Sequence, residues 1–195
     1  PVGLGQLPVK HGSPTVAMPG YDVRILDDAG YEVKDGTLGN IVVKLPLPPS
    51  CLPTLWGSDE RFRDSYLKEF PGYYKTADAG FRDEEGYLYF LGRNDDIIKS
   101  RGEKVSPVEV ENALYALTDV REAAVIGVDD AVLGQAIRAY VALIDGSALT
   151  PADIRRHCQG CLESYMVPGE VVILPELPKT DTGKIRKKSL TEEAT

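Results

Sequence analysis

The sequence predicts a mixed α/β fold in two parts, a β-rich segment over residues 1–94 and a small α/β domain over residues 95–195. In the first part, short runs of alternating apolar residues are separated by turn and proline signals, which is typical of strands. In the second part, capped helix starts alternate with buried strands. The chain has 195 residues, enough for one large domain or two small ones.

Residues 1–94 are predicted to be mostly strands joined by long loops. Alternation and turn signals place these strands over 21–26, 31–33, 40–45 and 86–92. A proline cluster that begins at Pro46 ends the third strand, because proline cannot donate a ladder hydrogen bond. Residues 58–69 are predicted to form a helix whose inward side carries Phe62 and Tyr66.

Residues 95–195 begin with a clear helix start. Ser106 suits the N-cap, Pro107 suits the first helical position, and Glu109 lies three residues after the cap, so a helix is expected to about Leu117. The remaining predicted elements are strands over 123–128, 138–144 and 171–174, and a helix that begins after Thr150 by the same capping logic.

Charge and hydropathy exclude two classes of partner. The formal net charge is −8, and an acidic surface repels phosphate backbones, so a nucleic-acid partner is not expected. Apolar runs such as 123–126 and 171–174 are too short to span a bilayer. The charge is uneven, however, because five basic residues lie within ten positions near the end: Lys179, Lys184, Arg186, Lys187 and Lys188. Such a run is either a solvated tail or a functional surface, and the residues alone leave both open.

The chain has three cysteines, an odd and small number that fits a reducing cytoplasm better than a disulfide framework. Cys158 and Cys161 form a C-x-x-C preceded by His157. A zinc site needs four ligands and no second pair is near. A redox pair gains from the start of a helix, whereas this one lies late in a predicted helix. We therefore expect a half-buried helix face with no metal.

Two segments, one around Asp78 and one from Arg93 to Lys99, carry groups suited to a nucleotide. Asp78 lies beside a strand, where a carboxylate can accept two hydrogen bonds from a ribose diol or simply cap a turn. Arg93 precedes Asp95, Asp96 and Lys99, an arrangement that suits either phosphate contacts or a surface ion-pair cluster.

Two later loops could also meet a ligand. Gly102 would let a ligand approach the backbone, although most loop glycines serve turn geometry. Lys184 follows Gly183 in a turn-rich loop and could meet phosphate charge as it develops. The loop is not a phosphate-binding G-x-x-x-x-G-K loop, since the first glycine would fall at Pro178.

In this order and spacing, the segments resemble those of the adenylate-forming, AMP-producing acyl-CoA synthetases, a superfamily that includes luciferases and peptide-synthetase adenylation domains. The matching stretches are 12–25, which resembles the region after the acyl-pocket motif; 74–78, like Y-x-T-G-D with Ala77 for glycine; 92–102, like the hinge G-R-x-D-D-x-I-K-x-x-G; 162–168, like L-P-x-Y-M-V-P with Glu163 for proline; and 178–187, like P-K-T-x-T-G-K-I-x-R with Lys187 for arginine. The resemblance covers nearly the whole chain.

The resemblance implies that residues 1–94 end a large N-terminal domain, as its distorted β-barrel subdomain, and that residues 95–195 form a mobile small C-terminal domain. The implied roles are Lys184 in catalysis, Asp78 and Arg93 in ATP/AMP binding, Asp95 as the hinge, Gly102 and Lys104 in the CoA/pantetheine channel, and Lys99 as a further candidate near the substrate or the CoA phosphates. Tyr165 and Pro168 are interpreted as structural.

The implied reaction converts a carboxylate and ATP to acyl-AMP and pyrophosphate, and then transfers the acyl group to CoA, with Mg²⁺ assisting the first step. Four segments, 45–49, 55–56, 60–62 and 70–74, resemble acetyl- and propionyl-CoA synthetases, whereas 98–103 resembles broader acyl and aryl ligases. A short or medium carboxylate is the expected substrate. The alternatives are the end of a peptide-synthetase-type domain that loads a carrier protein, and a non-catalytic binding module derived from the small domain.

We predict that the 195-residue chain alone does not form an acyl-adenylate. The family's Ser/Thr/Gly-rich phosphate loop and its Y-G-x-T-E-like segment do not occur in the sequence, so the partner it needs is the N-terminal portion of the same enzyme. Pyrophosphate exchange into ATP, measured with the purified chain and a panel of short carboxylates, should stay at background. Exchange above background would show the prediction to be wrong.

Overall fold

The computed structural model describes residues 7–193 and divides into two compact units, the first ending at Asp95 and the second beginning at Asp96. We describe each unit by itself. Sequence reasoning placed a boundary between residues 94 and 95, and the assignment of the two units to the two domains of an adenylating enzyme stays a prediction. In the described part of the chain, no helix is both long and apolar enough to cross a membrane.

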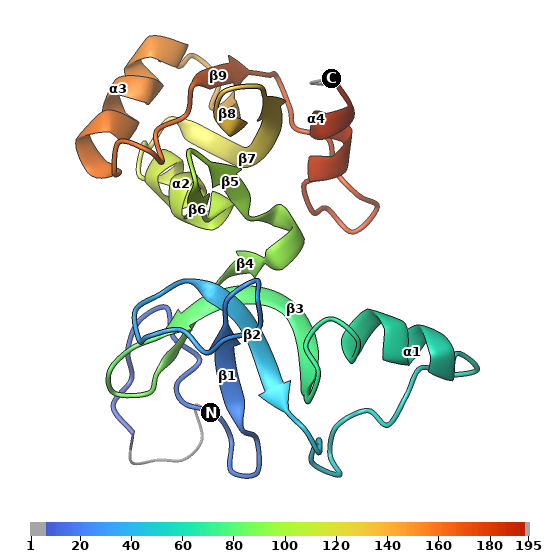
Figure 1. The fold of residues 1–195 in the computed structure, drawn as a ribbon. Helices are drawn as coiled ribbons and strands as arrows, with labels where there is room; N and C mark the ends of the chain where they lie inside the picture. The colour runs from blue at the N-terminus through green and yellow to red at the C-terminus, as the bar shows by residue number, and fades with distance from the viewer. Residues whose placement is uncertain (1–6, 194–195) are drawn as a thin grey trace. The chain divides into compact units, whose positions relative to one another are not determined.

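The first unit is built on an antiparallel sheet of four strands in the order β1-β2-β3-β4 (Figure 1). The strands are β1 (Val23–Leu26), β2 (Gly39–Lys44), β3 (Tyr73–Arg82) and β4 (Leu88–Arg93), and helix α1 (Asp59–Tyr66) lies between β2 and β3 in sequence. Two clusters of buried apolar residues pack on this sheet. One contains Ile25, Ile41 and Leu88, and the other contains Leu26, Val42 and Phe70. Alternate residues of β1 and β2 thus serve two cores, as strand geometry requires.

Three expectations for this unit need correction. The expected strand at 31–33 is only a single bridge between Leu26 and Glu32. Sequence reasoning missed β3, whose letters YYKTADAGFR lack strict alternation. In the described residues the sheet is an open four-stranded sheet and does not close into the barrel that the resemblance implied. The expectation of a mixed α/β fold is itself confirmed.

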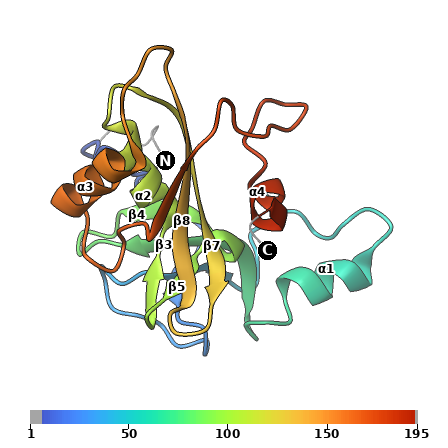
Figure 2. The same ribbon diagram turned by 90° about the horizontal axis from the view of Figure 1, so that it is seen from above.

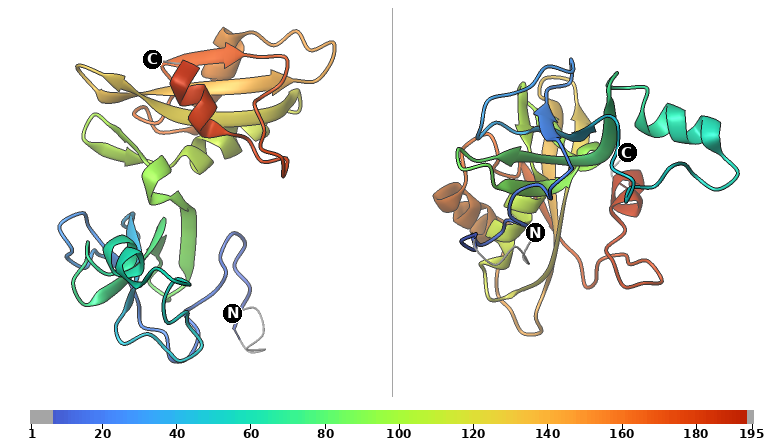
Figure 3. Two further views of the ribbon diagram at one scale, coloured as in Figure 1. Left: turned by 90° about the vertical axis from the view of Figure 1, so that its right-hand side faces the viewer. Right: turned by 90° about the horizontal axis from the view of Figure 1, so that it is seen from below.

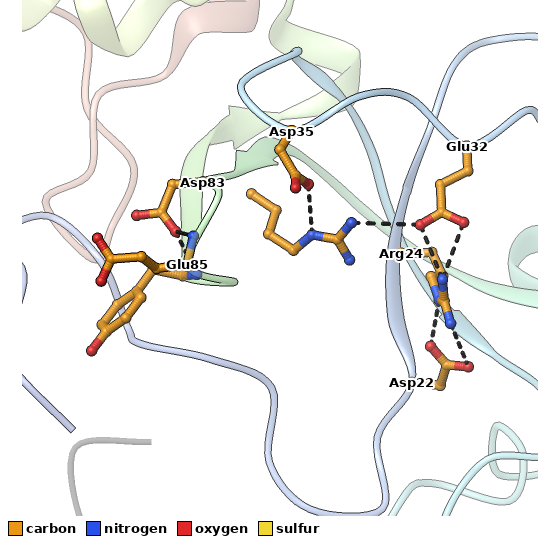
Figure 4. A network of polar contacts seen from close by, with 8 residues as sticks. Asp22, Arg24, Glu32, Asp35, Asp83 and Glu85 are labelled. Carbon is orange, nitrogen blue, oxygen red and sulfur yellow. Dashed lines mark hydrogen bonds and ion pairs between the residues drawn. The ribbon is translucent and has the colours of Figure 1, made fainter. Parts of the chain in front are cut away.

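Ion pairs fasten the turn regions of the first unit to its strands (Figure 4). The guanidinium of Arg24 on β1 binds Asp22 and Glu32, and these hydrogen bonds raise its pKa. Arg82 on β3 contacts the same Glu32 and also Asp35. Because every one of these side chains is partly exposed, each pair contributes little stability on its own and mainly fixes the loop that joins β1 to β2.

The second unit contains a five-stranded sheet ordered β6-β5-β8-β7, with β9 parallel to β8. Its strands are β5 (Ile98–Ser100), β6 (Glu103–Val105), β7 (Val120–Asp130), β8 (Gly134–Leu143) and β9 (Glu170–Ile173), and its helices are α2 (Pro107–Tyr115), α3 (Pro151–Cys161) and α4 (Lys187–Glu193). A short 3₁₀ turn, Asn94–Asp96, precedes it.

The sheet of this unit is covered on both faces, by α2 and α3 on one side and by α4 on the other (Figures 2 and 3). Ala123 and Val125 of β7 join the core shared with α2 and α3, whereas Ala124 and Ile126 join the core that contains Leu190 of α4. The period of two along one strand therefore divides the unit into two apolar cores.

The predicted helix starts are confirmed. The hydroxyl of Ser106 accepts from the backbone N–H of Glu109 at 3.4 Å, and Pro107 occupies the first turn. Thr150 and Asp153 form a complete capping box at the start of α3. Sequence reasoning missed the short hairpin β5–β6 and the terminal helix α4, both of which lie beside residues expected to act on substrates.

Candidate functional site

Asp78 and Arg93 lie directly opposite each other on β3 and β4. The Arg93 guanidinium is 3.7 Å from an oxygen of Asp78 and 3.3 Å from an oxygen of Asp95. All three side chains are at least one-third exposed, so this contact is a loose ion-pair group open to solvent. The structure thus brings together three of the predicted residues at the end of the first unit, and it places Asp78 on a strand where sequence reasoning placed it on a loop.

A bulge in β3 lies directly before and at Asp78 and interrupts the pairing with β2. Between the pairs Asn40–Ala79 and Val42–Lys75, the single residue Ile41 faces the three residues 76–78. The hydroxyl of Thr76 donates to the Ile41 carbonyl at 2.7 Å, and it accepts from the Asp78 N–H at 3.1 Å. Bulges of this kind redirect a side chain away from the regular pleat.

Ala77 holds a left-handed backbone conformation at the centre of this bulge, with φ of +66°. For a residue with a Cβ, this conformation costs about 1 kcal/mol or more. Ala77 stands where the resembled Y-x-T-G-D segment has glycine, and the structure gives the physical reason for glycine there. A second bulge lies beside it in β4, between the pairs Ala79–Gly92 and Gly80–Phe90.

The predicted channel residues lie on the β5–β6 hairpin. Gly102 is at its exposed tip with φ of +82°, and a Cβ added there would meet no atom within 4 Å. Lys99 and Lys104 are direct cross-strand partners.

Lys184 lies in a loop, as its turn-rich sequence led us to expect, and this loop is tight and hairpin-like. Lys179 and Ile185 form an antiparallel bridge. Between them, the Thr180 N–H donates to the Lys184 carbonyl at 2.7 Å, and the Lys184 N–H donates to the Thr180 hydroxyl at 3.1 Å. Gly183 closes the turn with φ of +81°. Among residues 7–193, the exposed Lys184 ammonium has no ion-pair partner.

Ion pairs anchor both sides of this loop, hereafter the Lys184 loop (residues 180–184). On one side, Lys179 lies 2.7 Å from Glu122 of β7. On the other side, Lys187 lies 2.7 Å from Glu111 of α2, and the same oxygen accepts from the Val125 N–H at 2.9 Å. The basic residues near the end of the chain therefore differ in their contacts. Lys179 and Lys187 form ion pairs with Glu122 and Glu111, whereas Lys184 has no ion pair within residues 7–193.

The C-x-x-C segment shows no sign of metal or redox chemistry in the described residues. Burial raises the pKa of the Cys158 thiol to about 11, which keeps it protonated. The Nε2 atom of His157 lies 2.9 Å from the Ala113 carbonyl, which places the imidazole in the packing between α3 and α2. Within residues 7–193, no group of three or more His, Cys, Asp or Glu residues is placed to hold a metal ion.

Comparisons with known proteins agree on one family. Residues 109–184 match the model of the AMP-binding enzyme C-terminal domain. The acetyl-coenzyme A synthetase of Deinococcus radiodurans is 39% identical over 190 residues, which are 97% of this chain and 29% of that protein. The curated relatives that the chain matches are about three times its length, since it spans 28% to 31% of them.

Solved structures show the same likeness. ATP-bound MatB from Rhodopseudomonas palustris superposes with a TM-score of 0.79 at 31% identity, over 93% of this chain and 35% of that one. The anthranilate CoA ligase AuaEII, in complex with anthranoyl-AMP, gives a TM-score of 0.80 at 32% identity, over 96% of this chain and 36% of that one.

Ala77→Gly should stabilise the chain by about 0.5 to 1 kcal/mol, because glycine relieves the strain of the left-handed conformation. The greater conformational entropy of glycine in the unfolded state offsets only part of this stabilisation. Urea titration followed by circular dichroism measures the change. The matched control is Ala79→Gly, at a buried strand position with ordinary φ, which should destabilise by about 1 kcal/mol. Loss of stability in Ala77→Gly would contradict the strain argument.

Glu122→Gln should remove a pH-dependent part of the stability. The hydrogen bond from Lys179 lowers the pKa of Glu122, so its contribution is fully present above the unfolded pKa of about 4.3 and is lost as pH falls through the lower folded pKa. We expect the variant to be less stable by about 1 to 2 kcal/mol at pH 7, with the gap closing in acid. Glu176→Gln, which removes the more exposed partner of Lys179, should show a smaller gap at every pH.

Proposed function

We propose that this chain, which belongs to the adenylate-forming, AMP-producing acyl-CoA synthetase family and matches the C-terminal portion of its members, supplies part of the active site of such an enzyme. The activity we propose is the ATP-dependent ligation of a short carboxylate to CoA. The observation that carries the proposal is the Lys184 loop: within residues 7–193 the Lys184 ammonium has no ion-pair partner, whereas Lys179 and Lys187 on either side of the loop form ion pairs with Glu122 and Glu111.

In the first half-reaction, a carboxylate oxygen attacks the α-phosphorus of ATP. The new P–O bond replaces the bond to the β-phosphate, and pyrophosphate leaves. Negative charge concentrates on oxygens around phosphorus, where a fixed cation lowers the barrier most. We assign this role to the Lys184 ammonium. Its backbone is held by hydrogen bonds to Thr180, so little ordering is needed when substrate arrives.

Asp78 and Arg93 suit the nucleotide in the same step. The Asp78 carboxylate can accept from both ribose hydroxyls, because it is partly exposed and its contact with Arg93 is loose. Arg93 then has donors left for the ribose and phosphates. Asp95, the last residue of the first unit, is the hinge in this proposal.

In the second half-reaction, the CoA sulfur attacks the acyl carbonyl, the C–S bond forms, and the C–O bond to AMP breaks. AMP leaves with the electrons of that bond, and the thiol proton passes to solvent. We assign the passage of the pantetheine arm to Gly102, whose open backbone admits a close approach. Lys104 and Lys99 lie beside it on the same hairpin, within reach of anionic groups.

Acceptor, substrate and setting are part of the same proposal. The relatives bear the names of CoA synthetases and ligases, which supports CoA over a carrier protein as the thiol. The acetyl-coenzyme A synthetase among them supports a short carboxylate. The free cysteines of the described residues suit the cytoplasm. Mg²⁺ is expected to accompany ATP in the first half-reaction, and no group of three or more His, Cys, Asp or Glu residues within residues 7–193 is placed to hold it.

Lys184→Ala, in the enzyme that carries this chain at its C-terminal end, should lower the rate of acyl-AMP formation by about 10²- to 10³-fold. Thioester formation from supplied acyl-AMP should remain largely intact, because Lys184 serves only the first half-reaction. Pyrophosphate exchange and single-turnover thioester assays measure the two steps. Lys188→Ala, at a lysine that is 87% exposed, is the control and should leave both rates unchanged. Equal loss in both half-reactions would contradict the assignment of Lys184.

A further inference from the structure

Glu122 of β7 holds the chain just before the Lys184 loop. One of its oxygens lies 2.7 Å from the Lys179 ammonium, and the other accepts from the Leu177 N–H at 3.3 Å. The hydrogen bond from Lys179, and after it that from the Leu177 N–H, lowers the pKa of the carboxyl group. The first side of the loop is therefore fastened through a side chain and through the backbone at once.

Glu111 of α2 holds the chain just after the loop, by a contact that also closes the edge of the sheet. β7 is the last strand in the order β6-β5-β8-β7, so the N–H groups on its outer side face no further strand of the described sheet. One oxygen of Glu111 accepts from the Val125 N–H at 2.9 Å, and the same oxygen lies 2.7 Å from the Lys187 ammonium at the start of α4. A single carboxylate thus joins α2, β7 and α4. The side chains of Glu111 and Glu122 are only 15% and 17% exposed.

The hydrogen bonds of the Lys184 loop itself are all internal. Within the described part of the chain, every hydrogen bond made by residues 180–184 goes to another residue of the same loop. These bonds fix the shape of the turn, but they do not fix where the turn lies on the second unit. Its place depends on its two ends, where Leu177 and Ile185 add apolar contacts with the core beside α4. Apolar contacts have no preferred direction, whereas the two carboxylates hold each end in a defined direction.

We propose that Glu111 and Glu122 are positioning residues for Lys184, which fix the place of its ammonium during acyl-AMP formation. This inference rests on the proposed function, because it takes Lys184 as the cation that meets the α-phosphate. A cation lowers the barrier most where it is placed in advance, and a misplacement of about 1 Å can cost about 100-fold in rate. Neither carboxylate contacts a substrate in this role. Each acts through the lysine that it binds and through the end of the loop that this lysine holds.

Glu111→Gln and Glu122→Gln test the inference in the enzyme that carries this chain at its C-terminal end. Each amide keeps the size of the side chain but loses the charge that holds a lysine. At a temperature where the variants stay folded, each should lower the rate of acyl-AMP formation by about 10-fold. Thioester formation from supplied acyl-AMP should change less than about twofold, because Lys184 serves only the first half-reaction. Lys187→Arg keeps the ion pair with Glu111 and should stay within about twofold of the unaltered enzyme in both assays.

A double-variant cycle separates positioning from general support of the fold. If the carboxylates act only through Lys184, adding Glu111→Gln to Lys184→Ala should change acyl-AMP formation less than about twofold. A further loss of about 10-fold in that background, or equal losses in the two half-reactions of a single variant, would overturn the inference. Asp119→Asn is the matched control, because its carboxylate accepts from the Ser147 hydroxyl at 2.7 Å and forms no ion pair within residues 7–193. It should leave the ratio of the two half-reaction rates unchanged.

Amide hydrogen exchange, followed by mass spectrometry on the same enzymes, gives a readout that does not depend on the reaction. The peptide over residues 177–187 should exchange faster in either glutamine variant, whereas the peptide over α3 should not change. Unchanged exchange of the first peptide would overturn the inference. If the unaltered enzyme shows no pyrophosphate exchange into ATP, the proposed function fails, and faster amide exchange then still shows that the two carboxylates hold the loop.

Discussion

The burial of both faces of the second unit's sheet is the constraint on which the rest of that unit depends. Successive residues of β7 point to opposite faces, so Val125 packs toward α2 and α3 while Ala124 and Ile126 pack toward α4. A register slip of one residue would exchange the two cores. Because both cores must be filled, the segment after β9 has to return across the sheet as α4. That return path carries the Lys184 loop, and the alternation within β7 is what fixes its position.

In the first unit, by contrast, the candidate site lies where the regular strand pairing is interrupted. Two adjacent bulges interrupt the β2–β3 and β3–β4 ladders close to Asp78. In a regular strand, successive side chains point to opposite faces of the sheet. The bulge interrupts this alternation at residues 76–78. The bulge is stabilised by the hydrogen bond from the Asp78 N–H to the Thr76 hydroxyl, and it contains Ala77 in a left-handed backbone conformation. Local backbone strain is thus present in both candidate ligand regions, at Ala77 and at Arg101, whose φ is +56° beside Gly102.

The sequence predicts those elements whose signals are local and periodic. Both capped helices, the long apolar strands β7 and β8, and the parallel strand β9 follow from capping residues and apolar runs. It does not predict β3, because a bulge destroys the period of two that identifies a strand. The β5–β6 hairpin is missed because Arg101-Gly102 lacks the Asn-Gly signal of its turn. Helix α4 is missed because tertiary packing of Leu190, rather than composition, stabilises a basic and acidic segment of seven residues. For the site, residue types pointed to Asp78, Arg93 and Lys184, but the availability of Lys184 depends on ion pairs that only the fold reveals.

The link between Lys187, Glu111 and the Val125 N–H has a consequence for how the end of the chain responds to cleavage. The Lys184 loop is exposed, whereas α4 is held by the buried Leu190 and by the carboxylate that also bonds β7. A protease that cuts the loop would sever the backbone without removing the contacts beyond it. The tail beyond the cut would stay docked as a short complementing peptide, so a nicked molecule would keep its fold while Lys184 lost the geometry of an unbroken loop.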